Sequence, residues 1–155
     1  MAKRVKTTEI FIHCSATPGS RDVTAVDIDR WHKKRGWSGI GYHYVIRRDG
    51  TVDKGRPTDV VGAHVRGYNM SSVGVCMIGG MTEDMTKAED NFTNEQWESL
   101  ETVVGILRRQ YHDALVVGHN DVTTKACPSF DVQEWAKSVG FHRTLADTPG
   151  PHTPT

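Results

Sequence analysis

The sequence lacks the features that would commit it to a charged partner, a disulfide framework or a membrane. Its 19 basic and 19 acidic residues balance to a formal net charge of +0, which argues against generic nucleic-acid binding. No apolar run approaches the length of a membrane span, and none follows the charges of residues 1–9 as a secretory signal would require. An odd set of cysteines predicts free thiols or a metal ligand, not paired disulfides. The three are Cys14, Cys76 and Cys127.

The chain is long enough to build a real core. It has 155 residues, of which 37% are hydrophobic and 25% charged, a balance typical of a folded protein. We find no internal repeat and no composition break, so we predict a single domain over residues 1–155. Residues 1–8 are expected to be flexible, and the Pro- and Gly-rich residues 147–155 to form a frayed tail.

Apolar periodicity and turn signals predict an alternation of strands and helices. The sequence motifs Thr24-x-x-Asp27 and Thr93-x-x-Gln96 indicate helix starts, and Asp49-Gly50 between two β-rich runs indicates a hairpin. We therefore expect an α/β (α+β) fold, with a mixed central sheet flanked by about three helices. The strands are predicted at 10–14, 42–56 (a hairpin), 72–80 and 115–118, and the helices from Thr24 to Gly36, over 94–112 and from Asp131.

Several side chains at strand ends and in loops are candidates for a functional site. His13 and His119 each follow a predicted strand, and ligands in such sheets collect at the C-terminal ends of strands. On the residues alone, His13 also fits a packed core histidine, Tyr42 a core ring and His64 an exposed loop histidine. His32 is predicted to lie on the surface of its helix, and Cys76 to be a packed thiol in a central strand.

A set of short motifs runs in order through nearly the whole chain. They include Phe11-Ile12-His13-Cys14-Ser15, Gly41-Tyr42-His43-Tyr44, Arg48-Asp49-Gly50-Thr51, Gly62-Ala63-His64, Gly67-Tyr68-Asn69 and Lys125-Ala126-Cys127-Pro128. With these motifs the chain resembles the zinc-dependent N-acetylmuramoyl-L-alanine amidases of the type-2 amidase and peptidoglycan-recognition-protein superfamily. Within that superfamily it is most similar to the small single-domain bacteriophage endolysins.

The resemblance implies a site and a cofactor. Carried over by position, it implies one Zn²⁺ per chain with His13, His119 and Cys127 as ligands, and catalytic roles for Tyr42 and Lys125. Some relatives have aspartate at the position of Cys127. The resemblance also places His64 on the wall of the substrate groove, and we add His43 and Asn69 as substrate-binding candidates.

The implied reaction is hydrolysis of the amide between the muramyl lactyl group and L-alanine of the stem peptide. Zinc polarises a carbonyl and lowers the pKa of water toward about 7. We expect Lys125 to stabilise the oxyanion, Tyr42 to orient the attacking water or relay its proton, and Asn120 or Asp121 to orient a ligand.

Other functions fit parts of the same pattern. A peptidoglycan-binding module without catalysis is the main alternative, and a thiol hydrolase with Cys127 as nucleophile and His119 as base is another. The resemblance also allows a second role, in which the protein binds a phage RNA polymerase. We expect a monomer that acts on bacterial peptidoglycan, with no direct nucleic-acid or membrane partner. It would accumulate in the host cytoplasm and reach the wall after another protein permeabilises the membrane.

Overall fold

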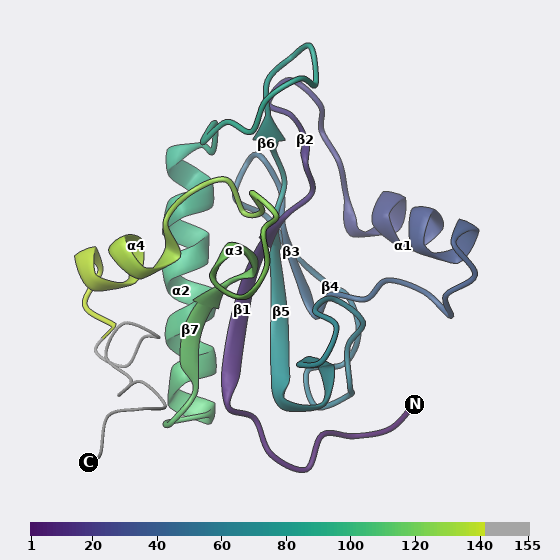
Figure 1. The fold of residues 1–155 in the computed structure, drawn as a ribbon, viewed down its shortest axis with the longest axis vertical. Coiled ribbons are helices and arrows are strands. Elements are labelled where there is room, and N and C mark those ends of the chain that lie inside the picture. Colours follow the sequence, from purple (N-terminus) through teal and green to yellow (C-terminus); the bar gives the residue numbers. More distant parts are fainter. Residues whose placement is uncertain (142–155) are drawn as a thin grey trace.

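A five-stranded mixed sheet forms the centre of the computed structural model, which describes residues 1–141 (Figure 1). β5 (Ser72–Met77) pairs in parallel with β1 (Glu9–Cys14) and with β3 (Tyr44–Ile46). β7 (Leu115–Gly118) runs parallel to β1 at one edge, and β4 (Val52–Lys54) runs antiparallel to β3 at the other. The mixed sheet predicted from the sequence is confirmed.

Helices cover both faces of this sheet. α2 (Asn94–Gln110) and α4 (Val132–Ser138) lie on one side of the central strands, and α1 (Ala25–Lys34) lies on the other (Figure 1). These are the three predicted helices. The one-turn helix α3 (His119–Val122) and the 3-10 helix η1 (Asn69–Ser71) were not predicted.

The predicted element boundaries shift where the backbone turns. The strand expected over 72–80 ends at Met77, because Gly79 and Gly80 adopt positive φ values of 131° and 99° and redirect the chain. The redirected segment β6 (Gly80–Met81) pairs in parallel with β2 (Thr17–Pro18) as a separate two-stranded sheet.

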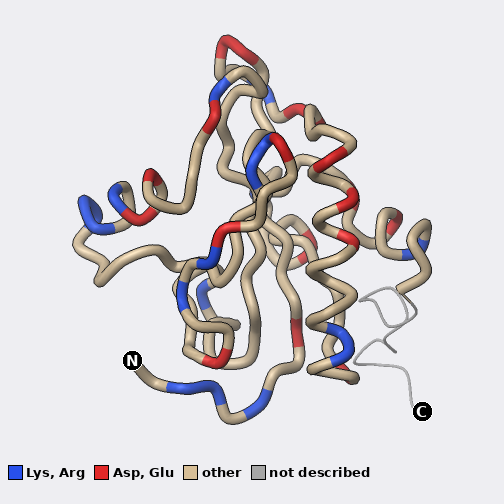
Figure 2. The backbone as a smooth tube through the Cα atoms, turned by 180° about the vertical axis from the view of Figure 1, so that it is seen from behind, with Lys and Arg blue, Asp and Glu red and all other residues tan. Residues whose placement is uncertain are grey.

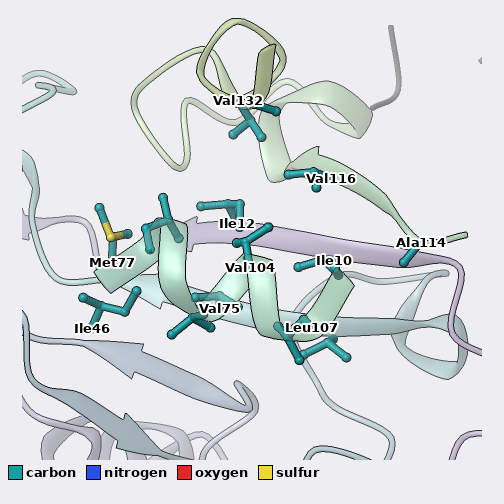
Figure 3. Close-up of a cluster of buried hydrophobic side chains, with 14 residues drawn as sticks. Ile10, Ile12, Ile46, Val75, Met77, Val104, Leu107, Ala114, Val116 and Val132 are labelled. Atoms are coloured by element: carbon teal, nitrogen blue, oxygen red, sulfur yellow. The ribbon is translucent and has the colours of Figure 1, made fainter. Parts of the chain in front are cut away.

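The larger core lies between the sheet and the helices α2 and α4. On β1, Ile10 and Ile12 point to this side, where they pack with α2 residues such as Val104 and Leu107 (Figure 3). Side chains alternate along a strand, so Phe11 and His13 of β1 point to the opposite face. His13 therefore lies on the side of the sheet away from α2.

Capping and charge placement explain why the helices form where the sequence indicated. Both predicted capping boxes are present, at Thr24 with Asp27 and at Thr93 with Gln96. Acidic side chains lie along the N-terminal part of α2 and basic ones at its C-terminal end, which complements the helix dipole (Figure 2). Within residues 1–141 no helix is both long enough and apolar enough to cross a membrane.

The segment before β1 is attached to the body of the protein. Arg4 donates to the carbonyl of Val60 at 2.9 Å and to the hydroxyl of Tyr111 at 3.3 Å, and the Val61 N–H donates to the Ala2 carbonyl. The flexibility expected for residues 1–8 stays a prediction, and such motion would require the hydrogen bonds of Arg4 to break. The tail predicted at 147–155 lies outside the described residues.

Candidate functional site

His13 and His119 lie side by side because they follow paired positions on two neighbouring parallel strands. The register pairs Ile12 of β1 with Gly118 of β7, and each histidine is the next residue. The two ring centroids are 4.8 Å apart with an angle of 67° between the planes. His13 is 1% exposed, whereas His119 begins helix α3 and is half-buried. Strand register thus places two imidazoles at one point of the sheet.

Cys127 joins them from the loop that follows α3. Its Sγ accepts a hydrogen bond from the Cys14 N–H at 3.2 Å, and it lies 3.8 Å from Nδ1 of His13. This contact spans 113 positions of the sequence, so the sheet edge at Cys14 is what fixes the sulfur beside the histidines.

Asn120 and Asp121 hold the backbone around these side chains. Nδ2 of Asn120 donates to the carbonyl of Phe130 at 3.0 Å and approaches that of Ala126 at 3.5 Å, one on each side of Cys127. Asp121 accepts from the Gly118 N–H at 2.7 Å. Asn120 therefore ties the thiol loop to the helix that begins with His119.

The geometry of the three side chains suits a zinc ion. One ligand atom from each of His13, His119 and Cys127 lies within 4.8 Å of the others. Atoms bound tetrahedrally to zinc at about 2.0–2.3 Å lie roughly 3.3–3.6 Å apart, so the 3.8 Å between Nδ1 and Sγ needs only a small adjustment. Two imidazoles and one sulfur leave a fourth position, as in catalytic zinc sites.

The ionisation of the trio also favours a cation. Burial lowers the pKa of His13 well below its usual value, and burial with nearby Lys125 lowers that of His119, so both imidazoles stay neutral and keep a lone pair. Its contact with Cys14, together with burial, raises the pKa of the Cys127 thiol. A protonated thiol is a poor nucleophile, which disfavours a thiol hydrolase, whereas a bound metal ion would stabilise the thiolate.

Tyr42 and Lys125 flank the same point. The Tyr42 ring centroid lies 5.1 Å from that of His13, and burial raises the pKa of its phenol well above 10, so it remains a proton donor. Lys125 is exposed in the loop before Cys127, and its charge lowers the pKa of both His13 and His119. The structure brings together all five residues that the sequence assigned to metal binding and catalysis.

A cavity of about 610 Å³ opens over these residues. Its wall includes His64 and Asn69, whose substrate contacts stay predictions, and also side chains that the sequence analysis did not assign. Such a cavity is large enough for part of a sugar–peptide substrate. The unassigned wall residues include His32, Arg35, Trp37, Arg66 and Thr123.

His32 is not on the surface, contrary to the prediction. It is 7% exposed, its Nδ1 accepts from the Gly41 N–H at 2.9 Å, and its ring lies 4.5 Å from that of Trp37. Helical spacing identified the face of α1 but not the glycine loop that folds back onto it. A contact of this kind, between a helix and a loop that folds back onto it, leaves no periodic signal in the sequence.

His43 is not among the residues that line this cavity, and its role in substrate binding stays a prediction. It is fully buried immediately before β3, where Nδ1 accepts from the Gly74 N–H at 3.0 Å. Its Nε2 then carries the proton and donates to the carbonyl of Val60 at 2.6 Å. Both nitrogens are committed to backbone, which makes His43 a buried link between strands and loop.

Comparisons with known proteins show which family this chain is similar to. A family model described as N-acetylmuramoyl-L-alanine amidase matches residues 3–130. The endolysin of Enterobacteria phage K11 is 50% identical over 136 residues, which cover 88% of this chain and 89% of that protein. The endolysin of Escherichia phage T7 is 46% identical over 133 residues, covering 86% and 87%.

A solved structure extends the likeness to three dimensions. The N-acetylmuramoyl-L-alanine amidase LysC from Clostridium intestinale URNW superposes with a TM-score of 0.75 at 33% sequence identity. The match covers 86% of this chain and 85% of LysC. The sheet and helices described above are therefore an architecture that this chain has in common with a named amidase.

Proposed function

The chain belongs to the N-acetylmuramoyl-L-alanine amidase family, and we propose that this amidase of the phage-endolysin type depends on one zinc ion held by His13, His119 and Cys127. The observation that carries the proposal is the convergence of three ligand atoms from β1, α3 and the following loop. A neutral pair of imidazoles, one buried and one half-buried, beside a thiol is a donor set that suits zinc.

Zinc, when bound, would polarise the scissile carbonyl and lower the pKa of water. The protein's own groups then have distinct tasks. Tyr42 stays protonated and lies against His13, so its hydroxyl is suited to orienting the attacking water and relaying a proton. Lys125 supplies a fixed positive charge at the cavity rim, where the carbonyl oxygen becomes negative.

The scissile bond would be the amide that joins the muramyl lactyl carbonyl to the amine of L-alanine. The cavity wall then holds the sugar and peptide on the two sides of this bond. His64 and Asn69 lie on that wall and remain proposed substrate contacts. Hydrolysis would free one carboxylate on the muramyl group and one amine on the peptide.

The test compares zinc content and amine release from purified peptidoglycan in matched variants. Cys127→Ser should lose most of its zinc and its activity. Cys127→Asp should keep more of both, because carboxylate is a zinc ligand that some relatives have at this position. His112→Ala, which removes an exposed histidine, is the control and should behave as wild type. Full zinc and full activity in Cys127→Ser would exclude the ligand assignment.

A peptidoglycan-binding module without catalysis is the alternative function. It is disfavoured because the three ligand side chains lie together, and two of them line the same cavity as Tyr42 and Lys125. The two functions differ in one product, a newly exposed L-alanine amine on wall fragments. Binding to peptidoglycan without release of that amine would support the module.

We propose further that the protein can bind a phage RNA polymerase, as the family resemblance implies. The N-terminal segment carries basic residues (Figure 2) and the fully exposed Val5, and none of its residues 1–8 is among those that line the cavity. Co-purification with the polymerase, reduced when residues 1–6 are deleted, supports this role. No complex at micromolar concentrations would contradict it.

We also propose that the protein accumulates in the host cytoplasm before lysis. It would then reach the wall through a membrane opened by another protein. Fractionation of infected cells before and after membrane permeabilisation tests this, and early appearance of the protein outside the membrane would contradict it.

A further inference from the structure

His13 has a second histidine behind it. Its Nε2 lies 2.9 Å from Nδ1 of His64, and the two rings meet edge to face, with centroids 5.0 Å apart and planes at 90°. The other nitrogen of His13, Nδ1, faces Cys127. His13 therefore has one nitrogen toward the candidate metal position and one toward His64.

The direction of these hydrogen bonds is fixed by a backbone carbonyl. The Ser72 hydroxyl donates to the carbonyl of Tyr68 at 2.7 Å, so its oxygen is left to accept from Nε2 of His64 at 3.3 Å. His64 with its proton on Nε2 has a lone pair on Nδ1, which accepts from Nε2–H of His13. With its proton on Nε2, His13 keeps a lone pair on Nδ1, the atom that faces Cys127.

The ring of His64 is held in one place by two glycines. A Cβ on Gly74 of β5 would lie 2.7–2.8 Å from three atoms of the ring, and one on Gly62 would lie 2.7 Å from Cδ2. The ring thus fills space that any side chain at these positions would occupy. Asn69 adds a backbone clamp, because its Oδ1 accepts from the N–H groups of His64 and Val65 at 2.8 and 2.9 Å.

We propose that His64 is a positioning residue for His13, which holds the His13 ring and its proton so that Nδ1 is free for the metal. The proposal rests on the proposed zinc function, and it gives His64 a task beyond contact with the substrate. It also makes Ser72 and the carbonyl of Tyr68 part of the same series of hydrogen bonds. A hydrogen-bond partner on the distal nitrogen of a metal-bound imidazole fixes its tautomer and raises its affinity.

The first experiment uses the metal-free wild-type protein. Long-range ¹⁵N–¹H NMR of the histidine rings locates the proton on each imidazole. We expect the His13 proton on Nε2, with slow exchange against solvent, and the His64 proton also on Nε2. A His13 proton on Nδ1 would overturn the proposal, whatever the protein's affinity for zinc.

The second experiment measures zinc affinity by chelator competition. His64→Phe keeps a ring but removes the acceptor, and should weaken zinc binding by roughly 10–100-fold. Ser72→Ala, which removes only the outer hydroxyl, should weaken it less. His64→Asn, whose Oδ1 can replace Nδ1 as acceptor, should recover part of the loss. His112→Phe makes the same exchange at an exposed histidine and should change nothing.

The outcomes separate this proposal from the zinc function on which it rests. If the wild type binds zinc and His64→Phe binds it equally well, the proposal fails and the zinc function stands. An increase in KM alone, with zinc affinity and the His13 proton unchanged, would make His64 a substrate contact only and would also overturn the proposal. If the wild type binds no zinc, the proposed zinc function fails. The NMR result still decides whether the hydrogen bonds from His13 through His64 to Ser72 are present. Should His64→Phe fail to fold, Ser72→Ala and the wild-type spectrum provide the test.

Discussion

Lys125 is the residue whose proposed role depends least on packing. It is exposed, so its removal should leave the core intact. We predict that Lys125→Ala lowers kcat by roughly 10²–10³, the usual effect of losing one donor to an oxyanion, with zinc content unchanged. Turnover on purified peptidoglycan fragments, measured beside metal analysis, checks this.

Lys137→Ala is the matched control, because Lys137 is an exposed lysine on α4, outside the residues of the cavity wall. It should retain wild-type turnover. Equal turnover in Lys125→Ala would remove Lys125 from the mechanism.

Because His43 is buried, we predict that the free energy of unfolding depends on pH. Burial lowers its pKa from the usual 6.5 to about 4 in the folded protein. Between these values the unfolded chain binds more protons, so stability falls as pH falls through this window, and the loss is complete below about pH 4. From pH 7 to pH 5 this residue should cost about 2 kcal/mol of the free energy of unfolding.

Urea denaturation of the metal-free protein at the two pH values measures this effect. Other buried histidines titrate in the same range, so the informative quantity is the difference between wild type and His43→Gln. The variant should be less stable at pH 7 but lose about 2 kcal/mol less on acidification. Identical pH dependence in both proteins would show that His43 is not buried in its neutral form.

The sequence identified some of these residues and not others for a physical reason. His13, Cys127 and Lys125 lie in local motifs, so their types and order were visible. The surroundings of His32 and His43 depend on backbone groups from distant loops, such as the N–H of Gly41 and of Gly74. No local pattern encodes those partners, so the surface position predicted for His32 was wrong and the backbone contacts that bury His43 were not predicted.

At the scale of elements, Gln96 connects α2 to the sheet. It is fully buried at the third position of the helix, where its Oε1 accepts from the Thr93 N–H and its Nε2 donates to the carbonyls of Ile46 and Ile78. We predict that Gln96→Ala lowers the free energy of unfolding by about 2–3 kcal/mol, because it removes part of a cap and leaves buried polar groups without one partner.

The control for this prediction lies on the same helix. Thr102 is exposed, and its hydroxyl bonds only to the Glu98 carbonyl among the contacts that the structure gives it. Thr102→Ala should change stability by less than about 0.5 kcal/mol. Equal urea midpoints for Gln96→Ala and wild type would contradict the prediction.

Elements with strong local signals were predictable. The two capping boxes lie where expected, and Gly50 has the positive φ of 88° that the hairpin signal required. The short pieces were missed: α3 has four residues, and β2 and β6 have two each. Elements this short are held by tertiary contacts and not by local propensity. One turn or one bridge is too brief to produce a period in the sequence, so these elements were not predicted.

At the scale of the whole molecule, the site exists only in the folded chain. His13, His119 and Cys127 are brought together by parallel strands and a returning loop, so the unfolded chain should bind zinc much more weakly. We predict that free zinc at 100 times its dissociation constant stabilises the protein by about 2.7 kcal/mol. For a chain of this size that raises Tm by about 5–10 °C.

Thermal unfolding with and without excess zinc measures this coupling. Cys127→Ser should show a much smaller shift, and His112→Ala the full shift. A Tm that does not respond to zinc in the wild type would mean that no zinc site forms on folding.

The most direct test of the account is turnover measured against zinc content, as metal-free protein is reloaded stepwise with zinc. We predict that amide hydrolysis rises in proportion to bound zinc and levels off at one ion per chain. Full turnover in the metal-free protein, or a rise that continues past one ion, would contradict the zinc site at His13, His119 and Cys127.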